Sequence, residues 1–259
     1  MDEQQFAEDT VRLAGEELLR LSALGFGTTV KGGNWKDIVT TVDVDVNAFI
    51  IKRLKETFSG DAIYSEEGGG GGSGIRLWVV DPIDGSSNFA RGIPHFAVCV
   101  GLVENGAPQA GAIYNPVTHD LFSFTKGGGA FLNGTRIAVS GITNTKEGYA
   151  LLTAGRRDDV REWGGESYKK LLANFQKTKN LGASALDIAF VASGRVEAVV
   201  YGTLTTEDIA PALGLLYEAG GVASLRDGSP VPLSKEAQRV YVANNEHILS
   251  FTRELLETP

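Results

Sequence analysis

An apolar strand that runs directly into acidic residues sets the strongest limit on how this chain folds. Residues 77–80 form a continuous apolar run, which is typical of a strand buried on both faces. Asp81 follows at once, Pro82 is predicted to end the ladder of this strand, and Asp84 comes three residues after Asp81. Acidic groups at the end of a buried strand are unfavourable unless something neutralises them, and a divalent cation held by oxygen ligands is the simplest candidate.

The residues on either side of this acidic pair favour a site for metal and phosphate. Two glutamates at 66–67 precede it, and GSS at 85–87 follows as a loop that opens a helix, where backbone N–H groups favour an anion. Taken alone, Asp-x-x-Asp-Gly is also a common turn sequence. The glycine-rich segment 68–74 lacks the Gly-Lys-Ser/Thr end of a P-loop, so we predict a flexible loop there.

The hydrophobic pattern of the first part of the chain predicts two helices and then a set of strands. Helical spacing marks residues 6–24 and a second helix with Val46, Ile50 and Leu54 on one face. Asn-Gly pairs at 105–106 and 133–134 are typical of hairpin turns and indicate an antiparallel meander. The expected strands of this meander are 62–64, 77–80, 96–103, 110–114, 120–125 and 130–132.

The last part of the chain alternates between the two kinds of element. We expect strands at 149–153, 196–201 and 240–243, and helices at 160–175, 184–192, 207–219 and 246–256. The fold class is therefore α+β, with helices layered on one mainly antiparallel and one mixed sheet. A polar stretch at 140–147 predicts a division into an N-terminal half, 1–140, and a C-terminal half, 141–259.

The charge balance excludes a general binder of nucleic acid or of anionic membranes. Lys and Arg number 24 and Asp and Glu number 32, which gives a formal net charge of −8 and no basic footprint. No apolar stretch reaches the length of a membrane span, so a cytoplasmic protein is expected. Cys99 is the single cysteine and lies in an apolar run, where a thiol usually behaves as a small buried hydrophobe.

Four segments carry a resemblance to a known family. The stretch WVVDPIDGSSNF at 78–89 resembles the signature of the inositol monophosphatase family of magnesium-dependent, lithium-sensitive phosphatases, a superfamily that includes fructose 1,6-bisphosphatases. DIVTTVD at 37–43, GASALD at 182–187, and EDIA at 207–210 followed by EAGG at 218–221 are similar to further family segments in the same order. The resemblance implies an α-β-α-β-α sandwich, usually assembled as a homodimer.

The resemblance also implies a set of metal ligands. The first magnesium ion would be bound by Glu66, Asp81 and the carbonyl of Ile83, and the second by Asp81, Asp84 and Asp208. Glu66 would help to hold a weaker third ion. Two departures from the family pattern lie here: Ser86 stands where the family often has Thr, and Glu207 stands where it usually has Trp.

The same resemblance implies catalytic and substrate-binding residues. Asp43 and Ser86, with Glu66, would assist the nucleophilic water, and Gly85 and Ser86 would contact the phosphate. Further substrate contacts are expected from Ala183, Ser184, Tyr201, Arg156 and Arg157. Tyr201 occupies the position where inositol-specific relatives look to have a glutamate, so we expect weaker selection for inositol and more tolerance of a second phosphate.

The implied function is a magnesium-dependent phosphomonoesterase with two to three Mg²⁺ ions per subunit. It would hydrolyse inositol 1-phosphate and other small sugar phosphates by in-line attack of a metal-activated water, without a covalent intermediate. A fructose 1,6-bisphosphatase or a dual-activity enzyme is the first alternative, and a 3′-phosphoadenosine-type nucleotidase is a weaker one. The alternative of another class is a non-catalytic metal-binding regulator with the same fold.

Overall fold

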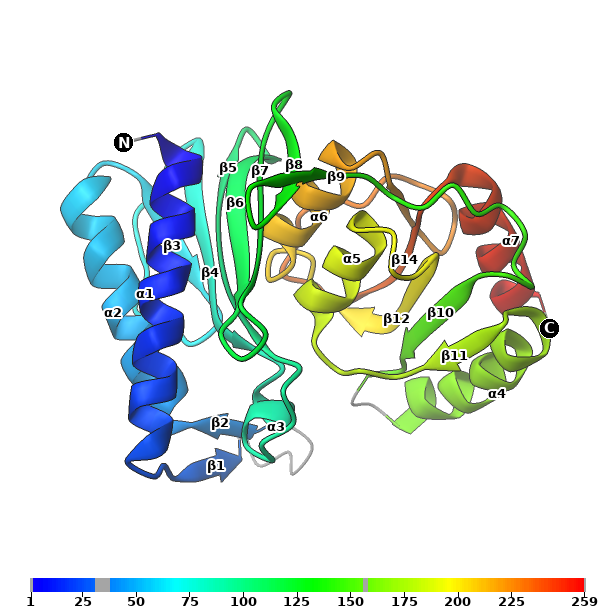
Figure 1. The fold of residues 1–259 in the computed structure, drawn as a ribbon, viewed down its shortest axis with the longest axis horizontal. Helices are drawn as coiled ribbons and strands as arrows, with labels where there is room; N and C mark the ends of the chain where they lie inside the picture. Colours follow the sequence, from blue (N-terminus) through cyan, green and yellow to red (C-terminus); the bar gives the residue numbers. More distant parts are fainter. Residues whose placement is uncertain (1, 31–37, 156–157, 259) are drawn as a thin grey trace.

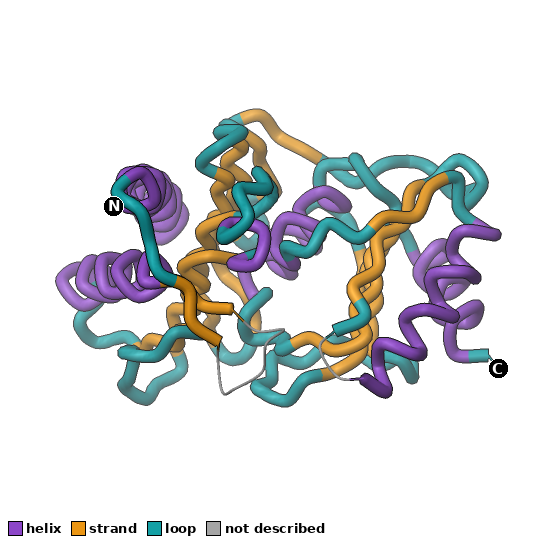
Figure 2. Tube along the Cα trace, turned by 90° about the horizontal axis from the view of Figure 1, so that it is seen from below, coloured by secondary structure: helices purple, strands orange, loops and turns teal. Residues whose placement is uncertain are grey.

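Five layers of helices and sheets form the molecule, in the α-β-α-β-α order that the family resemblance implies (Figures 1 and 2). The structure is a computed structural model that describes residues 2–30, 38–155 and 158–258. Two helices cover the outer face of a seven-stranded sheet, two lie between this sheet and a five-stranded one, and two cover the outer face of the second sheet. In that order the helix pairs are α1 (Glu3–Ala23) and α2 (Thr41–Thr57), α5 (Ser184–Ala192) and α6 (Ala210–Glu218), and α4 (Asp158–Asn174) and α7 (Glu246–Glu257).

The seven-stranded sheet is the predicted meander. Its strands follow chain order, the first pair is parallel, and all later pairs are antiparallel. Asn105 and Asn133, each followed by glycine, have the positive φ angles of 51° and 50° that two-residue hairpin turns require. The strands are β3 (Ala62–Ser65), β4 (Arg76–Asp84), β5 (Ala97–Glu104), β6 (Ala107–Asn115), β7 (Asp120–Thr125), β8 (Gly129–Leu132) and β9 (Thr135–Ile137).

The five-stranded sheet is mixed and has the order β11-β10-β12-β14-β13. β10 runs parallel to both β11 and β12, while β14 is antiparallel to its two neighbours. Its strands are β10 (Tyr149–Thr153), β11 (Lys177–Lys179), β12 (Ala198–Leu204), β13 (Val222–Leu225) and β14 (Gln238–Ala243). A separate hairpin of β1 (Thr28–Val30) and β2 (Ile38–Thr40) precedes α2. The prediction missed β1, β2, β9, β11 and β13, which have three or four residues each.

Alternation along the strands builds separate apolar cores on the two faces of each sheet. In β5, Val98 and Val100 pack against α1 and α2, whereas Ala97 and Cys99 belong to the core between the sheets. Cys99 is buried, as predicted. Residues 138–148 connect the sheets without helix or strand, while the core between the sheets joins both sides of that segment, so the division into two halves stays a prediction.

One feature of β4 differs from the prediction. Pro82 does not end the strand, which continues to Asp84. Asp81 pairs with Cys99 and Asp84 with Ala97, so three steps along β4 match two steps along β5. A regular strand would send residues 81 and 84 to opposite faces, but the extra residue of this bulge turns both toward the face of their partners, which lies between the sheets.

The helices of the described ranges do not resemble membrane spans, because none is both long and apolar enough to cross a bilayer. The longest helix is α1, which is amphipathic and packs against the meander through buried side chains such as Phe6, Val11 and Leu18.

Candidate active site

A pocket of about 540 Å³ opens where the bulged end of β4 faces the second sheet. Glu66, Asp81, Asp84 and Asp208 all line it, so the four predicted carboxylates come together although they are spread over 142 positions of sequence (208 − 66). The other lining residues are Ile83, Gly85, Ser86, Ser87, Asn88, Thr153, Gly155, Gly182, Ser184, Thr203, Leu204, Thr205, Ile209 and Ala237.

Asp81 lies at the centre of the acidic group. Its carboxylate is buried and accepts a hydrogen bond of 3.0 Å from the backbone N–H of Ile83. Burial raises the pKa of Asp81 well above its usual value, and the negative charges of Glu66, Asp84, Asp208 and Asp43 raise it further. The charged form of this site therefore needs a compensating positive charge.

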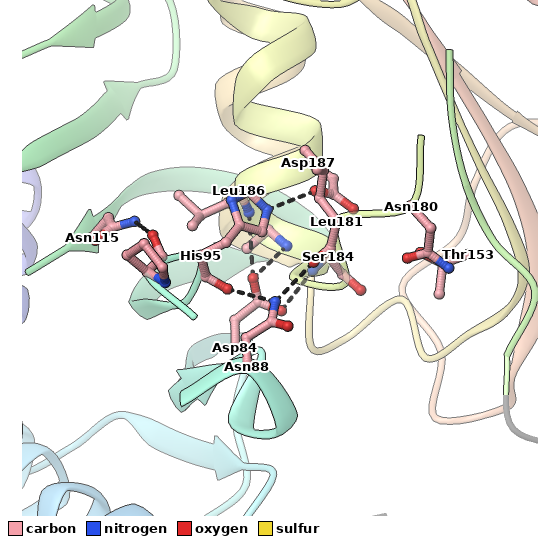
Figure 3. Close-up of polar contacts among 12 residues, drawn as sticks. Asp84, Asn88, His95, Asn115, Thr153, Asn180, Leu181, Ser184, Leu186 and Asp187 are labelled. Atoms are coloured by element: carbon pink, nitrogen blue, oxygen red, sulfur yellow. Dashed lines mark hydrogen bonds and ion pairs between the residues drawn. The ribbon is translucent and has the colours of Figure 1, made fainter. Parts of the chain in front are cut away.

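Asp84 is held by the start of α5 (Figure 3). Its carboxylate accepts hydrogen bonds from the backbone N–H groups of Ser184, at 2.7 Å, of Ala185, at 2.8 Å, and of Leu186, at 3.3 Å. The N-cap residue of α5, Ala183, provides no side-chain hydrogen bond, so Asp84 caps this helix from a distant strand. Burial, assisted by the charge of Asp187, raises the pKa of Asp84 to about 7, while these hydrogen bonds oppose the shift.

Asp43 and Ser86 form a hydrogen-bonded pair beside the acidic group. Asp43 is 1% exposed, and its Oδ2 accepts the backbone N–H of Thr40 in the capping box that begins α2. The Oγ of Ser86 lies 2.9 Å from Oδ1 of Asp43 and 2.8 Å from the carbonyl oxygen of Ile83. Burial raises the pKa of Asp43, although the hydrogen bonds from Thr40 and Ser86 act against it.

Gly85 provides a conformation that other residues avoid. Its φ of 87° lies in the left-handed region, and a Cβ there would stand 3.0 Å from both the carbonyl oxygen of His95 and the side chain of Ala183. Gly85 begins α3 (Ser86–Phe89), a single helical turn. The tight packing explains why Gly85 lines the pocket with backbone, while the buried Ala183 supports it from below and is not among the lining residues.

The loops around Gly85 are fixed by a buried polar network (Figure 3). The Nδ2 of Asn88 donates to the carbonyl oxygens of His95 and Leu181, both at 2.8 Å. His95 Nε2 lies 2.9 Å from an oxygen of Asp187, which is 0% exposed. This network joins the segment after α3 to the segment before α5, and so it fixes the two sides of the pocket that carry Gly85 and Ser184.

The structure corrects the prediction for Tyr201. This side chain is 1% exposed, belongs to the core between the sheets, and donates its hydroxyl to the carbonyl oxygen of Ser184 at 2.9 Å. It therefore supports the pocket from beneath and does not line it as a substrate contact would. Ser184 does line the pocket, whereas Arg156 and Arg157 lie outside the described residues.

The wall opposite the acidic group consists of small uncharged residues that the sequence analysis missed. Thr153 ends β10, and Thr203 and Thr205 lie at the end of β12 and just after it. Because β10 and β12 run parallel, their carboxyl ends meet at the same edge of the sheet. Polar residues at the ends of apolar strands were the available signal for this wall.

Tyr64 is a second residue that the sequence analysis missed. Its hydroxyl donates to Oδ1 of Asp208 at 3.0 Å and so links β3 to the segment before α6. The glycine-rich segment that follows Glu67 is tied to β3 and to α2: Gly71 pairs with Ile63 of β3, and Asn47 of α2 donates to the carbonyl of Gly68. The segment predicted as a flexible loop thus packs along β3, next to Glu66.

The donor set fits a hard divalent cation in its chemistry. Carboxylate and carbonyl oxygens surround one pocket, and neighbouring negative charges raise the pKa of the buried Asp81. The buried Oε2 of Glu207 has no hydrogen-bond partner within the described part of the chain. As the side chains stand, no three acidic, histidine or cysteine residues of the described ranges form a metal-holding group. The hydrogen bonds of the pocket carboxylates account for this arrangement, because the carboxylate of Asp84 is turned toward α5 and that of Asp81 toward the N–H of Ile83.

Comparison with known proteins places this layered fold and acidic pocket among phosphatases. The model of the inositol monophosphatase family matches residues 2–258. The chain therefore belongs to the inositol monophosphatase family, in agreement with the resemblance seen in its motifs. Small phosphorylated compounds are the substrates that this family implies.

Individual relatives carry different names. The chain is 36% identical over 233 residues to Nus factor SuhB of Pseudomonas aeruginosa, covering 86% of this chain and 85% of that protein. It is 32% identical over 224 residues to fructose-1,6-bisphosphatase/inositol-1-monophosphatase of Thermotoga maritima, covering 86% and 85%. The crystal structure of extragenic suppressor protein suhB from Bartonella henselae superimposes with a TM-score of 0.91 at 27% identity, covering 98% of each chain.

Proposed function

We propose that this protein is a Mg²⁺-dependent phosphomonoesterase that hydrolyses inositol 1-phosphate and other small sugar phosphates. The observation that supports this most is the convergence of four carboxylates and the Asp43–Ser86 pair on one pocket of about 540 Å³. The family membership adds to it, because the relatives include proteins named as inositol monophosphatases. The nearby hydroxyl-bearing wall suits a polyol better than an apolar group.

In this proposal the carboxylates hold the metal. Glu66, Asp81 and the carbonyl of Ile83 would hold one Mg²⁺, and Asp81, Asp84 and Asp208 would hold a second, with Glu66 contributing to a weaker third. Bound Mg²⁺ supplies Lewis acidity, which lowers the pKa of water and stabilises charge on phosphoryl and leaving oxygens. To bind the metal, Asp84 would give up some of its hydrogen bonds with the backbone N–H groups of α5.

The chain's own residues handle the proton and the substrate. Ser86 lines the pocket, and its Oγ can donate its single proton to either of two acceptors within 2.9 Å, so the oxygen can accept a proton from water as it gives up its own. Asp43, whose pKa is raised by burial, is placed to receive the proton of Ser86 in turn. Gly85 and Ser86 contact the phosphate through backbone N–H groups, and Ser184 borders the sugar.

A phosphate-release assay tests this function. We expect release from inositol 1-phosphate in Mg²⁺, none in excess chelator, and inhibition by Ca²⁺, whose longer bonds and variable geometry disturb in-line attack. Full activity in chelator would exclude the metal mechanism. Mg²⁺ binding without release from any of a panel of inositol and sugar phosphates would instead favour the alternative of a non-catalytic metal-binding regulator.

Hydrolysis of fructose 1,6-bisphosphate is a second candidate activity. The wall formed by Thr153, Thr203 and Thr205 carries no charge that would repel a second phosphate, and one relative is named for both activities. The test compares kcat/KM for inositol 1-phosphate and fructose 1,6-bisphosphate in one preparation. We also propose a homodimer, which sedimentation of the full chain would check.

A further inference from the structure

Tyr64 has no role in the mechanism above, yet it contacts one of the proposed metal ligands directly. It lies on β3 two residues before Glu66, and its hydroxyl donates to Oδ1 of Asp208 at 3.0 Å. Glu66 follows the end of β3 and lines the pocket, so Tyr64 lies on the strand that leads into this proposed ligand. Asp208 approaches from the start of α6, 144 positions away along the chain.

The ring of Tyr64 is fixed by apolar packing and by a cation. It packs, as Leu77 and Leu233 do, against a small buried core of Val79, Val103 and Ala210. The ammonium group of Lys235 lies 5.0 Å from the centre of the ring, which is a cation–π distance. A phenol has only two side-chain torsions, so a ring held in this way presents its hydroxyl in one direction with little loss of entropy.

The segment that carries Leu233 and Lys235 is itself anchored next to Asp208. The hydroxyl of Thr206 contacts the carbonyl oxygen of Pro232 at 2.6 Å and accepts the backbone N–H of Ser234 at 2.8 Å. Thr206 precedes Asp208 by two residues. The segment that packs near the ring of Tyr64 is therefore hydrogen-bonded to the segment that carries Asp208, so the donor and the acceptor belong to one connected part of the structure.

The hydroxyl of Tyr64 can orient the carboxylate of Asp208 without changing the charge of the site. A phenol is ordinarily protonated near neutral pH and can donate one hydrogen bond. Tyr64 therefore adds its hydrogen bond to Asp208 without adding a charge that would repel a cation.

We propose that Tyr64 is a positioning residue for Mg²⁺ binding, which acts by fixing the orientation of the Asp208 carboxylate. The inference rests on the proposed function, since it requires Asp208 to be a metal ligand. Partners that orient a ligand from outside the metal's own coordination sphere typically change metal affinity by about 10- to 100-fold.

Calorimetric titration of MgCl₂ into the purified full-length protein tests this role. Tyr64→Phe removes only the hydroxyl, and we expect it to weaken Mg²⁺ binding about tenfold or more. The matched control is Tyr241→Phe, which removes a hydroxyl that also donates to a carboxylate, that of Glu257, outside the pocket. This control is expected to keep wild-type Mg²⁺ affinity, even if its unfolding temperature falls.

Kinetics give a second measure of the same role. The Mg²⁺ concentration for half-maximal activity should rise in Tyr64→Phe, while kcat at saturating Mg²⁺ changes less. A purely structural role would lower the unfolding temperature and leave the Mg²⁺ affinity of the folded protein unchanged, and that result overturns the proposal.

Wild type and Asp208→Asn separate this proposal from the proposed function. If wild type binds Mg²⁺, Asp208→Asn binds it weakly and Tyr64→Phe binds it like wild type, the positioning role is wrong and the proposed function stands. If wild type binds no Mg²⁺, both are overturned. If Asp208→Asn binds Mg²⁺ like wild type, Asp208 is not a ligand and the positioning role is wrong, while phosphate release that requires Mg²⁺ leaves the proposed function standing.

Discussion

The two sides of the pocket differ in charge, and the difference separates two tasks. The side built on the seven-stranded sheet carries Glu66, Asp81, Asp84 and the Asp43–Ser86 pair. The side built on the five-stranded sheet presents threonines, and Asp208 follows β12 on this side. Most of the proposed chemistry thus lies on the first side, and substrate selection on the threonines of the second, where a residue can change without removing a ligand.

The origin of each side in the backbone also differs. The acidic side depends on one extra residue in β4, which places two carboxylates on the same face although they are three positions apart. The neutral side also lies next to a register shift, between Tyr201 and Leu204 of β12 against β14, but its threonines come from two parallel strands, β10 and β12, whose ends meet. Substitutions on the acidic side should therefore act on turnover, and substitutions on the neutral side on substrate preference.

Asp81→Asn should produce the largest effect. It removes charge from the centre of the acidic group, so we expect kcat/KM to fall by about 10³-fold or more, which corresponds to several kcal/mol of metal-dependent stabilisation. The protein should still fold, which circular dichroism can confirm. Near-normal turnover of the folded variant would contradict the central role of Asp81.

The same variant makes a prediction about stability in metal-free buffer. The pKa of Asp81 is raised in the folded protein, so the unfolded chain releases this proton at a lower pH and ionisation destabilises the fold as the pH rises above about 4. Asp81→Asn should therefore be more stable than wild type, by an amount that grows from pH 4 toward pH 7. Denaturant unfolding at both pH values measures this, and a gain that shrinks over that range would contradict it.

Ser86→Ala should have the second largest effect. It removes the hydroxyl that Asp43 orients, and loss of a proton-transfer group typically lowers kcat by about 10²- to 10³-fold. Ser86→Thr keeps the hydroxyl and should retain most of the activity. If Ser86→Ala and Ser86→Thr lose activity equally, packing at this position matters and the proposed proton transfer does not.

The sequence predicted the acidic side better than the neutral side, for physical reasons. An apolar run followed by acidic residues is visible in one stretch of sequence, whereas the bulge that orients Asp84 depends on pairing with β5. Tyr201 was misplaced because β12 is apolar on both faces: Val199 and Tyr201 face one core while Ala198 and Val200 face another, so periodicity does not say which face meets the pocket.

The fold, like the pocket, could be predicted in part from the sequence. Elements such as α5 and β7 were predicted with their observed bounds. The alternation of elements predicted helices layered on two sheets, and the order of the five layers was implied by the family resemblance. The five strands that were missed have three or four residues each, and so few positions are too short a stretch for alternation to be recognised. The hydrogen bond between Tyr64 and Asp208 joins residues that no local pattern connects.

Thr153→Asp tests the neutral side. A negative charge there should repel the second phosphate of fructose 1,6-bisphosphate, so kcat/KM for this substrate should fall about tenfold relative to that for inositol 1-phosphate, equivalent to ~1.4 kcal/mol. Thr153→Asn has nearly the same shape without the charge and is the matched control. An equal change in both variants would show that shape, not charge, sets the preference at this wall.

Glu207→Gln should produce the smallest effect, because Glu207 lies next to the acidic side and is not one of the proposed ligands. Its charge reaches the site, since it contributes to the raised pKa of Tyr64, and its buried Oε2 has no hydrogen-bond partner in the described ranges. Removing one negative charge near a cation site should weaken Mg²⁺ binding by about three- to fivefold, equivalent to roughly 1 kcal/mol.

Glu236→Gln changes the net charge equally at an exposed position and should leave Mg²⁺ affinity unchanged. Tighter Mg²⁺ binding in Glu207→Gln would mean that this glutamate competes with the ligands by repulsion instead of attracting the cation, and calorimetric titration of both variants distinguishes the two signs.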